Sequence, residues 1–573
     1  MDIDAGNPAL AVNRVASARS SARSDIEAAS VAGSASYTAA DEKKQRARSN
    51  DGQEDAVPSS DSDIGRDEER GAAPAPAQDD HGHPHYSKVR LLSLVLTVTG
   101  AAFLNTLGVQ AAVIVLPTIG RDLSIPDSRQ QWIVSAYSLT FGCFLLLWGR
   151  LADVYGKRLI FIWGSAWLTV ITVVLPFVKS EIGFDVLRGL QGLGAAANVP
   201  TAIGILGVTF PPGRAKNYAF SCYGAGAPLG SIFGNLMGGV IGEYASWKWV
   251  FWVLAILAAL VTLAGIFIIP PPPIQNPNLT AKSAVDWIGG TLVTVGLMVL
   301  MFALTEGNVV GWSTPWVPTL IVASVAILLL FVLWQRYLET KTTQRPLMKV
   351  SIFHNLRFSA AMVIMLLFFA AFNNYLIFAT YFFQDYLGLS VIQTTLRFIP
   401  TGVCGIIIAF ATGFFLSRVP GNYILMFGTL SVSVSVLLFA TPIPPHTTYW
   451  AYGLPAMVLA VFGADTVYPC LTLFTAKSLP QEDQALGGAL INAVGQIGRA
   501  IGLAIATAVE TAVIAAEKGV SVDEVGGEDV ESGDSALLSG LRAAEWFTFG
   551  LAIAAFALAG VAFRGAGYIG KKH

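Results

Sequence analysis

The chain has 573 residues, of which 54% are hydrophobic and 13% are charged, and its formal net charge at pH 7 is -2. Soluble domains carry about 25% charged residues, so this composition excludes a soluble globular protein and predicts a membrane protein with many spans. The near-zero net charge argues against a nucleic-acid partner. Four cysteines lie far apart inside apolar runs, which indicates packing residues and no disulfide or metal site. They are Cys143, Cys222, Cys404 and Cys470.

The first 88 residues differ from the rest of the chain. They are rich in Ala, Ser, Asp, Glu, Arg and Gly, and they contain no apolar run. Such a composition cannot bury enough surface to offset the entropy of folding, so we expect a disordered cytosolic tail without a cleavable signal peptide. His81, His83 and His85 could bind a metal ion, but no second group of ligands accompanies them, which favours a polar linker.

From Leu91 onward the sequence consists of apolar runs long enough to cross a bilayer as helices. We count fourteen runs and expect both termini in the cytosol, because Lys and Arg are then concentrated in the cytosolic loops. The runs span approximately 91–116, 131–150, 159–178, 184–209, 218–242, 249–269, 286–305, 316–335, 359–383, 395–416, 423–442, 450–475, 485–515 and 546–563.

Two loops between the runs are distinctive. Residues 516–545 contain several acidic side chains and are predicted to form an outside loop before the last span. Residues 270–283 open with four prolines and are predicted to form a stiff cytosolic linker. Asn278 begins a glycosylation sequon within that linker, and its cytosolic position predicts that it is unmodified.

A short charged turn joins the second and third runs, with the sequence Gly149-Arg-Leu-Ala-Asp-Val-Tyr-Gly-Lys-Arg158. Its glycines allow a tight turn and its charges hold the turn at the water boundary, as they would in any membrane hairpin. The pattern G-x-L-A-D-x-x-G-[KR]-[KR] resembles the loop between spans two and three of the major facilitator superfamily, with Val154 where that family usually has a basic residue. The resemblance implies a cytosolic gate whose charges pair in one state and part in the other. The gate residues are Gly149, Asp153, Gly156, Lys157 and Arg158.

The fourth run carries a polar face, because its spacings place Arg188, Gln191 and Asn198 on one side of a helix. A guanidinium at membrane depth is costly unless it faces protein or water, so Arg188 is a functional candidate. The alternative is that Arg188 reaches the outer boundary of the bilayer. The pattern R-x-x-Q-G-x-G-A-A resembles the fourth-span motif of the same superfamily, which implies a role for Arg188 in proton coupling.

The fifth run contains glycines near one-turn spacing, which allow a second helix to approach closely, and a proline that permits a bend. These residues are Gly224, Pro228, Gly230, Gly234 and Gly238. Small residues alone more often indicate packing, but the pattern partly resembles the fifth-span motif of drug:proton antiporters, which implies export. Trp247-Lys-Trp-Val-Phe251 resembles a motif of the fourteen-span branch. Three stretches resemble the fungal aminotriazole-resistance group of that branch: Leu104-Asn-Thr-Leu107, Leu116-Pro-Thr-Ile119 and Trp132–Phe141.

The first run has no carboxylate, so a coupling proton needs another acceptor. Asp465 is the most central carboxylate of any run, and burial penalises its ionised form, which makes Asp465 the second candidate for proton coupling beside Arg188. The alternative is a permanent ion pair between Asp465 and Arg499. Other polar side chains of the runs are candidates for lining the substrate path: Asn105, Gln110, Gln191, Asn198, Asn373, Asn374, Asn492, Gln496 and Arg499.

The resemblance implies an all-α polytopic membrane protein with the major facilitator fold, in which two six-helix bundles and two additional helices surround a midplane cavity. The expected division is an N-terminal tail (1–88), a first bundle (89–269), a linker with helices seven and eight (270–358), a second bundle (359–563) and a cytosolic C-terminal tail (564–573).

The predicted function is proton-coupled export of small toxic compounds, drugs or secondary metabolites by a monomer in the plasma membrane, with the vacuolar membrane as the alternative location. The expected partners are a small-molecule substrate, protons and the lipid bilayer, with no cofactor and no metal. A proton-coupled importer and a non-transporting sensor of the same fold are the alternatives. An enzyme is disfavoured because the sequence shows no nucleophile–base pair, nucleotide loop or metal cluster.

Overall fold

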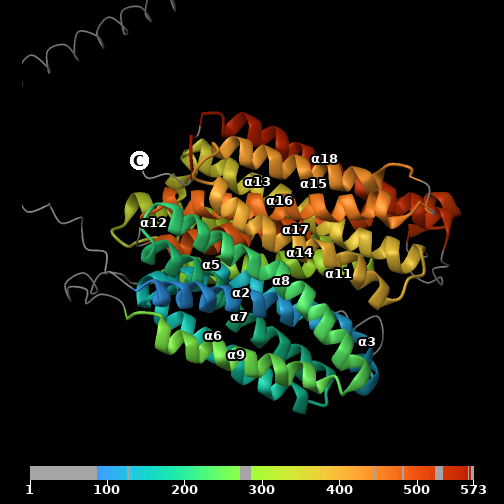
Figure 1. Cartoon of the computed structure of the whole chain (residues 1–573), viewed down its shortest axis with the longest axis horizontal. Helices are drawn as coiled ribbons and strands as arrows, with labels where there is room; N and C mark the ends of the chain where they lie inside the picture. Colours follow the sequence, from blue (N-terminus) through green and yellow to red (C-terminus); the bar gives the residue numbers. More distant parts are fainter. Residues whose placement is uncertain are drawn as a thin grey trace, which may run out of the picture. The chain divides into compact units, whose positions relative to one another are not determined.

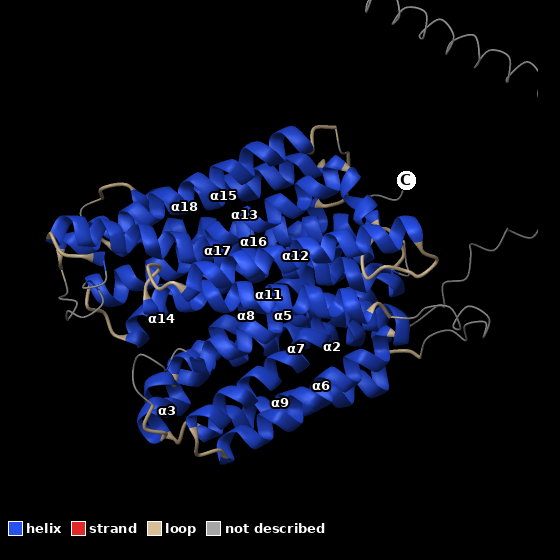
Figure 2. Cartoon of the chain, turned by 180° about the vertical axis from the view of Figure 1, so that it is seen from behind, coloured by secondary structure: helices blue, strands red, loops and turns tan. Residues whose placement is uncertain are grey.

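The computed structural model describes residues 87–125, 130, 132–271, 285–443, 445, 447–480, 483–522, 525, 533–565 and 567–569. Within this part of the chain every regular element is a helix and no strand is present (Figures 1 and 2). The predicted tail over 1–88 lies outside the described residues except for Ser87 and Lys88. His81, His83, His85 and Asn278 also lie outside them.

Fourteen long helices in the described part correspond to the fourteen predicted runs. Thirteen are long and apolar enough to cross a membrane. The exception is α8, whose many glycines lower its hydropathy although it is 31 residues long. The long helices are α2 (Lys88–Ile114), α5 (Trp132–Tyr155), α6 (Lys157–Val174), α7 (Glu181–Thr209), α8 (Arg214–Tyr244), α9 (Lys248–Ile268), α11 (Trp287–Val310), α12 (Trp316–Lys341), α13 (Leu356–Tyr381), α14 (Val391–Phe415), α15 (Gly421–Ala440), α16 (Tyr449–Ser478), α17 (Gln484–Lys518) and α18 (Ser535–Ala562).

Shorter helical segments connect some of these helices. They are α3 (Leu116–Asp122), the 3-10 turns η1 (Leu175–Phe177) and η2 (Val350–His354), and the π-helical turn η3 (Phe382–Tyr386), which directly follows α13.

The predicted outside loop over 516–545 is wrong at both ends. Helix α17 continues to Lys518, and α18 begins at Ser535, so only the residues between them can form the connection. The first turns of α18 bury Leu537 and Leu541 but alternate them with polar residues. A hydropathy window averages over both faces of such a helix and therefore misses its start. The acidic residues 523–524 and 528–531 lie outside the described residues.

The helices pack as two groups. Helices α2, α5, α6, α7, α8 and α9 pack mainly on one another, and so do α13, α15, α16, α17 and α18, which α14 joins through its contact with α16. In Figure 1 the first group, coloured blue to green, lies below the second group, coloured yellow to red. We call these the N-terminal and C-terminal groups. The groups meet mainly through the pairs α8–α14, α5–α17 and α7–α17, with smaller contacts of α16 with α8 and α7, and we call this contact surface the seam.

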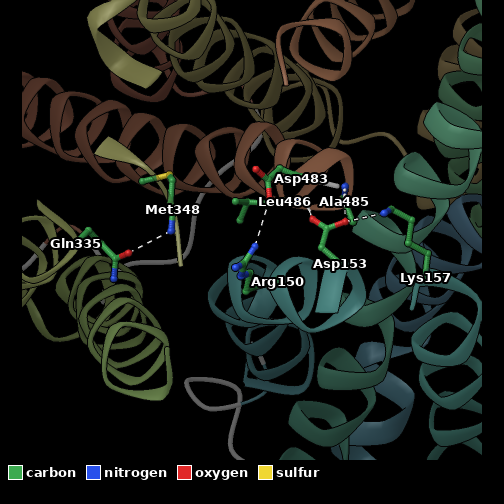
Figure 3. A network of polar contacts seen from close by, with 8 residues as sticks. All are labelled: Arg150, Asp153, Lys157, Gln335, Met348, Asp483, Ala485 and Leu486. Atoms are coloured by element: carbon green, nitrogen blue, oxygen red, sulfur yellow. Dashed lines mark hydrogen bonds and ion pairs between the residues drawn. The ribbon is translucent and has the colours of Figure 1, made fainter. Parts of the chain in front are cut away.

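The two additional helices lie beside the seam between the groups. Helix α11 packs on its partner α12, on α5 of the N-terminal group and on α17 of the C-terminal group. Asp286 caps α11, since its carboxylate accepts the Gly289 amide at 2.9 Å and the Gln335 Nε2 donor at 2.6 Å. Gln335 in turn accepts the Met348 amide at 3.1 Å (Figure 3). These bonds fasten the segment before α13 to α12.

A row of glycines brings α8 against α2, the closest helix pair of the N-terminal group. A Cβ atom at Gly226 would lie 2.8 Å from the Thr99 carbonyl oxygen, and one at Gly234 would lie 2.7 Å from the Leu107 carbonyl oxygen. Gly230 and Gly238 continue the row against carbonyl oxygens of α2. Since real Cβ atoms do not approach so closely, only glycine permits this contact. Gly224, which the sequence placed in the row, instead faces Pro469 of α16.

Candidate functional site

The turn between α5 and α6 is a single residue. Helix α5 ends at Tyr155, Gly156 has φ +103°, and α6 begins at Lys157. Side chains with a Cβ atom rarely adopt this positive φ, which explains the glycine. The turn places Asp153 at the end of α5 and Lys157 at the start of α6, where their side chains meet at 2.8 Å.

Asp153 also connects the two helix groups. Its carboxylate oxygens accept the backbone amides of Ala485 at 3.2 Å and Leu486 at 2.8 Å, both in the first turn of α17 (Figure 3). The first amides of a helix have no partner within the helix and carry partial positive charge, so a carboxylate is well placed there. The Asp153 side chain is only 2% exposed. It therefore acts as an N-terminal cap supplied by the opposite group.

A second ion pair crosses the seam at the same place. Arg150 contacts Asp483, the N-cap residue of α17, at 3.2 Å (Figure 3). Gly149 allows this approach, because a Cβ atom at Gly149 would lie 2.5 Å from the Ala489 Cβ atom. Arg158 takes no part in these contacts. It donates instead to the Ile266 carbonyl oxygen of α9 at 2.8 Å, within its own group.

Arg188 lies in a buried polar cluster of the N-terminal group. The residue is fully buried, its Nε donates to the Ile133 carbonyl oxygen at 2.7 Å, and its Nη1 donates to Gln191. Gln191 donates onward to Thr172 at 2.8 Å. The guanidinium lies 4.9 Å from the centre of the Tyr137 ring. Arg188 therefore faces other protein groups, as expected of a guanidinium within a helix bundle.

One nitrogen of this cluster has no partner. The Nη2 atom of Arg188 is buried without a hydrogen bond among the described residues, and so is Oδ1 of Asp185, which lies one turn earlier on α7. Tyr137, which stacks on Arg188, donates to Asn105 of α2. The cluster thus links α2, α5 and α7. It also contains one donor and one acceptor that form no hydrogen bond among the described residues.

Two further amides predicted to line the path make contacts inside the N-terminal group. Gln110 donates to Ser231 of α8 at 3.1 Å, and Asn198 accepts from Ser165 of α6 at 3.0 Å. Asn198 is 4% exposed and lies in the α6–α7 contact.

Asp465 of α16 lies at the seam, and its surroundings are apolar. It is 3% exposed, and its Oδ2 has no hydrogen-bond partner in the described part of the chain. A Cβ atom at Gly405 of α14 would lie 2.9 Å from that oxygen and 3.6 Å from the Cβ atom of Pro228 on α8. Asp465 therefore sits where α8 of one group meets α14 and α16 of the other. Among the described residues it forms no ion pair with Arg499, so the structure does not show the predicted alternative.

Arg499 belongs to an aromatic and polar cluster. Its guanidinium lies 4.6 Å from the centre of the Phe369 ring, and Phe369 packs edge-on against Tyr468. The Tyr468 hydroxyl donates to Asn492 at 3.3 Å and is hydrogen-bonded to Tyr223 of α8. This cluster joins α13, α16 and α17 to α8 of the N-terminal group.

The remaining candidates separate into two kinds. Gln496 of α17 lies near the seam, since a Cβ atom at Gly142 of α5 would lie 3.4 Å from its Cβ atom. Asn374 of α13 is completely buried and donates to the Gly502 carbonyl oxygen at 3.0 Å and to Thr548 at 3.4 Å. It therefore lies inside the C-terminal group, away from the seam. Asn373 is only partly buried.

Comparison with known proteins identifies the family. Residues 98–503, most of the chain, match the Major Facilitator Superfamily. The chain belongs to the major facilitator superfamily. It is therefore an integral membrane transporter for small molecules, and the all-helical fold predicted from the sequence is confirmed. The human organic anion transporter MFSD10 has the same fold, with a TM-score of 0.58 at 16% identity, over 82% of this chain and 99% of its own.

Fungal members of the superfamily are among its relatives. The low affinity ammonium transporter of Saccharomyces cerevisiae is 32% identical over 74% of this chain and 82% of its own length. The efflux pump terJ of Aspergillus terreus is 29% identical over 80% and 86%, respectively. The aminotriazole resistance protein of Saccharomyces cerevisiae is 27% identical over 82% and 83%. The predicted resemblance to the aminotriazole-resistance group is confirmed.

The sequence did not reveal several residues of this superfamily member that the structure places at the seam or in the α2–α8 contact. Arg150 stands at a variable position of the hairpin motif, and Asp483 lies 333 residues away. Gly226 belongs to the α8 row, but the superfamily pattern drew attention to Gly224 instead. Tyr223 and Tyr468 belong to none of the sequence motifs described above. Only Gly226 had a sequence signal, because its four-residue spacing to Gly230 continues the row.

Proposed function

We propose that this chain is a proton-coupled efflux transporter that exchanges cytosolic toxic compounds, drugs or secondary metabolites for external protons. The observation that carries the proposal is Asp465, a buried carboxyl without an ionic partner at the contact of α8, α14 and α16. A closed seam excludes water and disfavours an ionised carboxylate, whereas an open seam hydrates it. Opening and closing the seam would therefore release and take up a proton.

The direction of transport rests on α8 and on the relatives. The glycine row of α8 holds that helix rigidly on α2, and Pro228 of the same helix lies beside Asp465. A movement of α8 against α14 would change the surroundings of Asp465 directly. The pattern of this helix resembles that of drug:proton antiporters, and an efflux pump is among the relatives.

The α5–α6 turn and its contacts with the start of α17, which we call the hairpin end, form the gate in this proposal. With both termini in the cytosol, the contacts of Asp153 and Arg150 with α17 close the cytosolic side in the conformation seen here. Opening to the cytosol would break both contacts and leave Asp153 with Lys157, while Arg158 would stay on α9. One proton entering down a potential of about 100 mV supplies about 2.3 kcal/mol, which sustains roughly a fifty-fold substrate gradient.

Import is the second candidate, since the low affinity ammonium transporter is the relative with 32% identity. Proteoliposomes containing the full chain distinguish the two directions. An imposed pH gradient, with acid on the side opposite the compartment that holds the substrate, should drive export of a drug panel and aminotriazole. Methylammonium, an analogue of ammonium, serves as the import probe.

Export that depends on the gradient and is lost in Asp465→Asn, but not in Glu517→Gln, would support the proposal. Glu517 is an exposed carboxyl on α17 and is the matched control. Uptake of methylammonium driven by the gradient, without export of any compound, would replace export by import. Substrate binding with no movement in either direction would indicate a sensor.

A further inference from the structure

A second buried carboxyl, Glu545, lies in the C-terminal group and takes no part in the proposed gate or seam. It is on α18, 2% exposed, and neither of its carboxylate oxygens has a hydrogen-bond partner among the described residues. Burying an isolated carboxylate is very costly, and proteins avoid that cost by pairing the charge or by neutralising it. No described cation contacts Glu545, so pairing does not account for it.

The groups that face Glu545 supply no positive charge. Arg542, one turn earlier on α18, donates instead to the Ile443 carbonyl oxygen at 2.8 Å. On α13 the facing titratable group is Tyr375, which is fully buried and directs its hydroxyl to Met457 at 3.6 Å. Helix α15 has no Asp, Glu, Lys, Arg or His in its sequence.

The other elements packed on α18 are no more basic near Glu545. On α17 the acidic Glu510 is the group on this side, and its carbonyl oxygen packs against Gly540, more than one turn before Glu545. Arg499 of α17 stacks on Phe369. The π-helical turn η3, which also contacts α18, contributes the exposed acidic Asp385.

An amide of α13 one turn away along α18 is also incompletely satisfied. Asn374 of α13 uses its amide nitrogen for Gly502 and for Thr548, and Thr548 lies one turn after Glu545 on α18. The Asn374 Oδ1 atom remains buried without a donor. The two Glu545 oxygens and the Asn374 Oδ1 atom are thus buried acceptors of the C-terminal group that have no donor among the described residues.

We propose that Glu545 is a proton-binding residue, and that it carries its proton in this conformation as a neutral acid between α13 and α18. A proton neutralises the Glu545 carboxyl without any further ligand, whereas a hard metal cation takes about six or more oxygen ligands. The site differs from Asp465 because it lies within one helix group and does not face the seam. The burial of Glu545 and its lack of described hydrogen-bond partners support this assignment whichever way the substrate is transported.

The test is infrared difference spectroscopy of the purified full chain in lipid nanodiscs at neutral pH. Subtracting the spectrum of Glu545→Gln from that of the wild type should leave the carbonyl band of a protonated carboxylic acid, which shifts in heavy water. Subtracting Glu517→Gln, the exposed control, should leave a carboxylate band instead. A carboxylate band for Glu545 would overturn the proposal.

Thermal unfolding provides a second measurement. Glutamine matches the shape of the neutral acid, so Glu545→Gln should match the wild-type melting temperature at about pH 4, where the carboxyl of the unfolded chain is also protonated. As the pH rises from there, the wild type should lose stability relative to this variant, because the unfolded chain releases the proton that the folded chain must bind. A glutamine variant that fails to fold, while Glu545→Met folds and lacks the acid band, would still support a neutral acid at this position.

Sodium is tested in the same experiment. A melting temperature that rises with sodium chloride but not with choline chloride at equal ionic strength, and only when Glu545 is present, would overturn the proton in favour of the metal ion. Strong destabilisation of both the Gln and Met variants at neutral pH would indicate an ionised Glu545 and would contradict the proposal.

Discussion

Asp153 and Asp465 are both buried aspartates at contacts between the two helix groups, yet their surroundings are opposite. Asp153 accepts from Lys157 and from two amides of α17. Asp465 has an oxygen with no donor among the described residues and lies beside Gly405, Pro228 and Val461. The first carboxylate has partners that offset the cost of burying its charge, and the second has none in the described part of the chain.

This difference indicates two separate roles: Asp153 stabilises one arrangement of the helices, and Asp465 responds to protons. The Asp153 carboxylate stabilises one arrangement of the helices, because the two α17 amides lose their acceptor when the groups separate, whereas Lys157 stays with it. The ionised form of a carboxyl without donors becomes more stable when the seam opens and water reaches it. The hairpin end therefore favours the closed state through its contacts, and the middle of the seam responds to protons.

The largest predicted effect is that of Asp465→Asn. Asparagine keeps the size of the side chain but cannot exchange a proton, so export should lose its dependence on the pH gradient. The substrate gradient at steady state should fall about fifty-fold at about 100 mV, the equivalent of one proton. The measurement is substrate accumulation in proteoliposomes, beside substrate exchange without a gradient, which should continue. A variant that still follows the pH gradient would remove Asp465 from the coupling step.

The second largest effect is expected from the packing of α8 on α2, which places Pro228 beside Asp465. Gly230→Ala places a Cβ atom against the Phe103 carbonyl oxygen, and such overpacking should lower the free energy of unfolding by about 1–3 kcal/mol. Gly239→Ala is the matched control on the same helix, since nothing lies within 4 Å of its Cβ position. Thermal unfolding in nanodiscs should show a loss for the first variant and no loss for the second. Equal losses would mean that general helix effects and not the α2 contact explain the row.

A smaller effect is expected from the ion pair beside Asp153. The side chains of Arg150 and Asp483 are 5% and 16% exposed, so their attraction is only partly screened. A double-mutant cycle with Arg150→Ala and Asp483→Ala should give a coupling energy of about 1 kcal/mol. The same variants should shift the population toward the state open at the hairpin end, measured as faster labelling of a cysteine placed at Ala489. Unchanged labelling would show that Asp153 alone holds this end.

The sequence was sufficient for what depends on local pattern. Hydropathy located all fourteen long helices of the described part, and spacing placed Arg188 and Gln191 on one helical face, where the structure shows them hydrogen-bonded. Contacts between distant helices were not predictable. Nothing in the sequence pairs Arg150 with Asp483, or directs Arg158 to α9 when motif and charge suggested Asp153. The helical period also misassigned Gly224, because the orientation of α8 is set by its packing on α2.

The smallest effect is expected from the ion pair of Lys518 and Asp534 at the opposite end of α17. Its distance of 3.1 Å matches that of Arg150 and Asp483, but its side chains are 27% and 21% exposed. The Ala536 amide, and then Lys518, hold the pKa of Asp534 below its ordinary value, so its stabilising effect is present at neutral pH and is lost as the pH falls through that lowered pKa.

Asp534→Asn keeps an acceptor for the α18 cap and removes only the charge. It should therefore cost a few tenths of a kcal/mol at neutral pH and less at high salt, because water and ions screen an exposed pair. Hydrogen exchange in the first turn of α18 measures this effect, and acid should remove the difference between the wild type and the variant. If this pair proved as strong as Arg150 and Asp483, then burial would not be what distinguishes them. The contact between the hairpin end and α17 would then depend on the helix amides that donate to Asp153, and not on any ion pair.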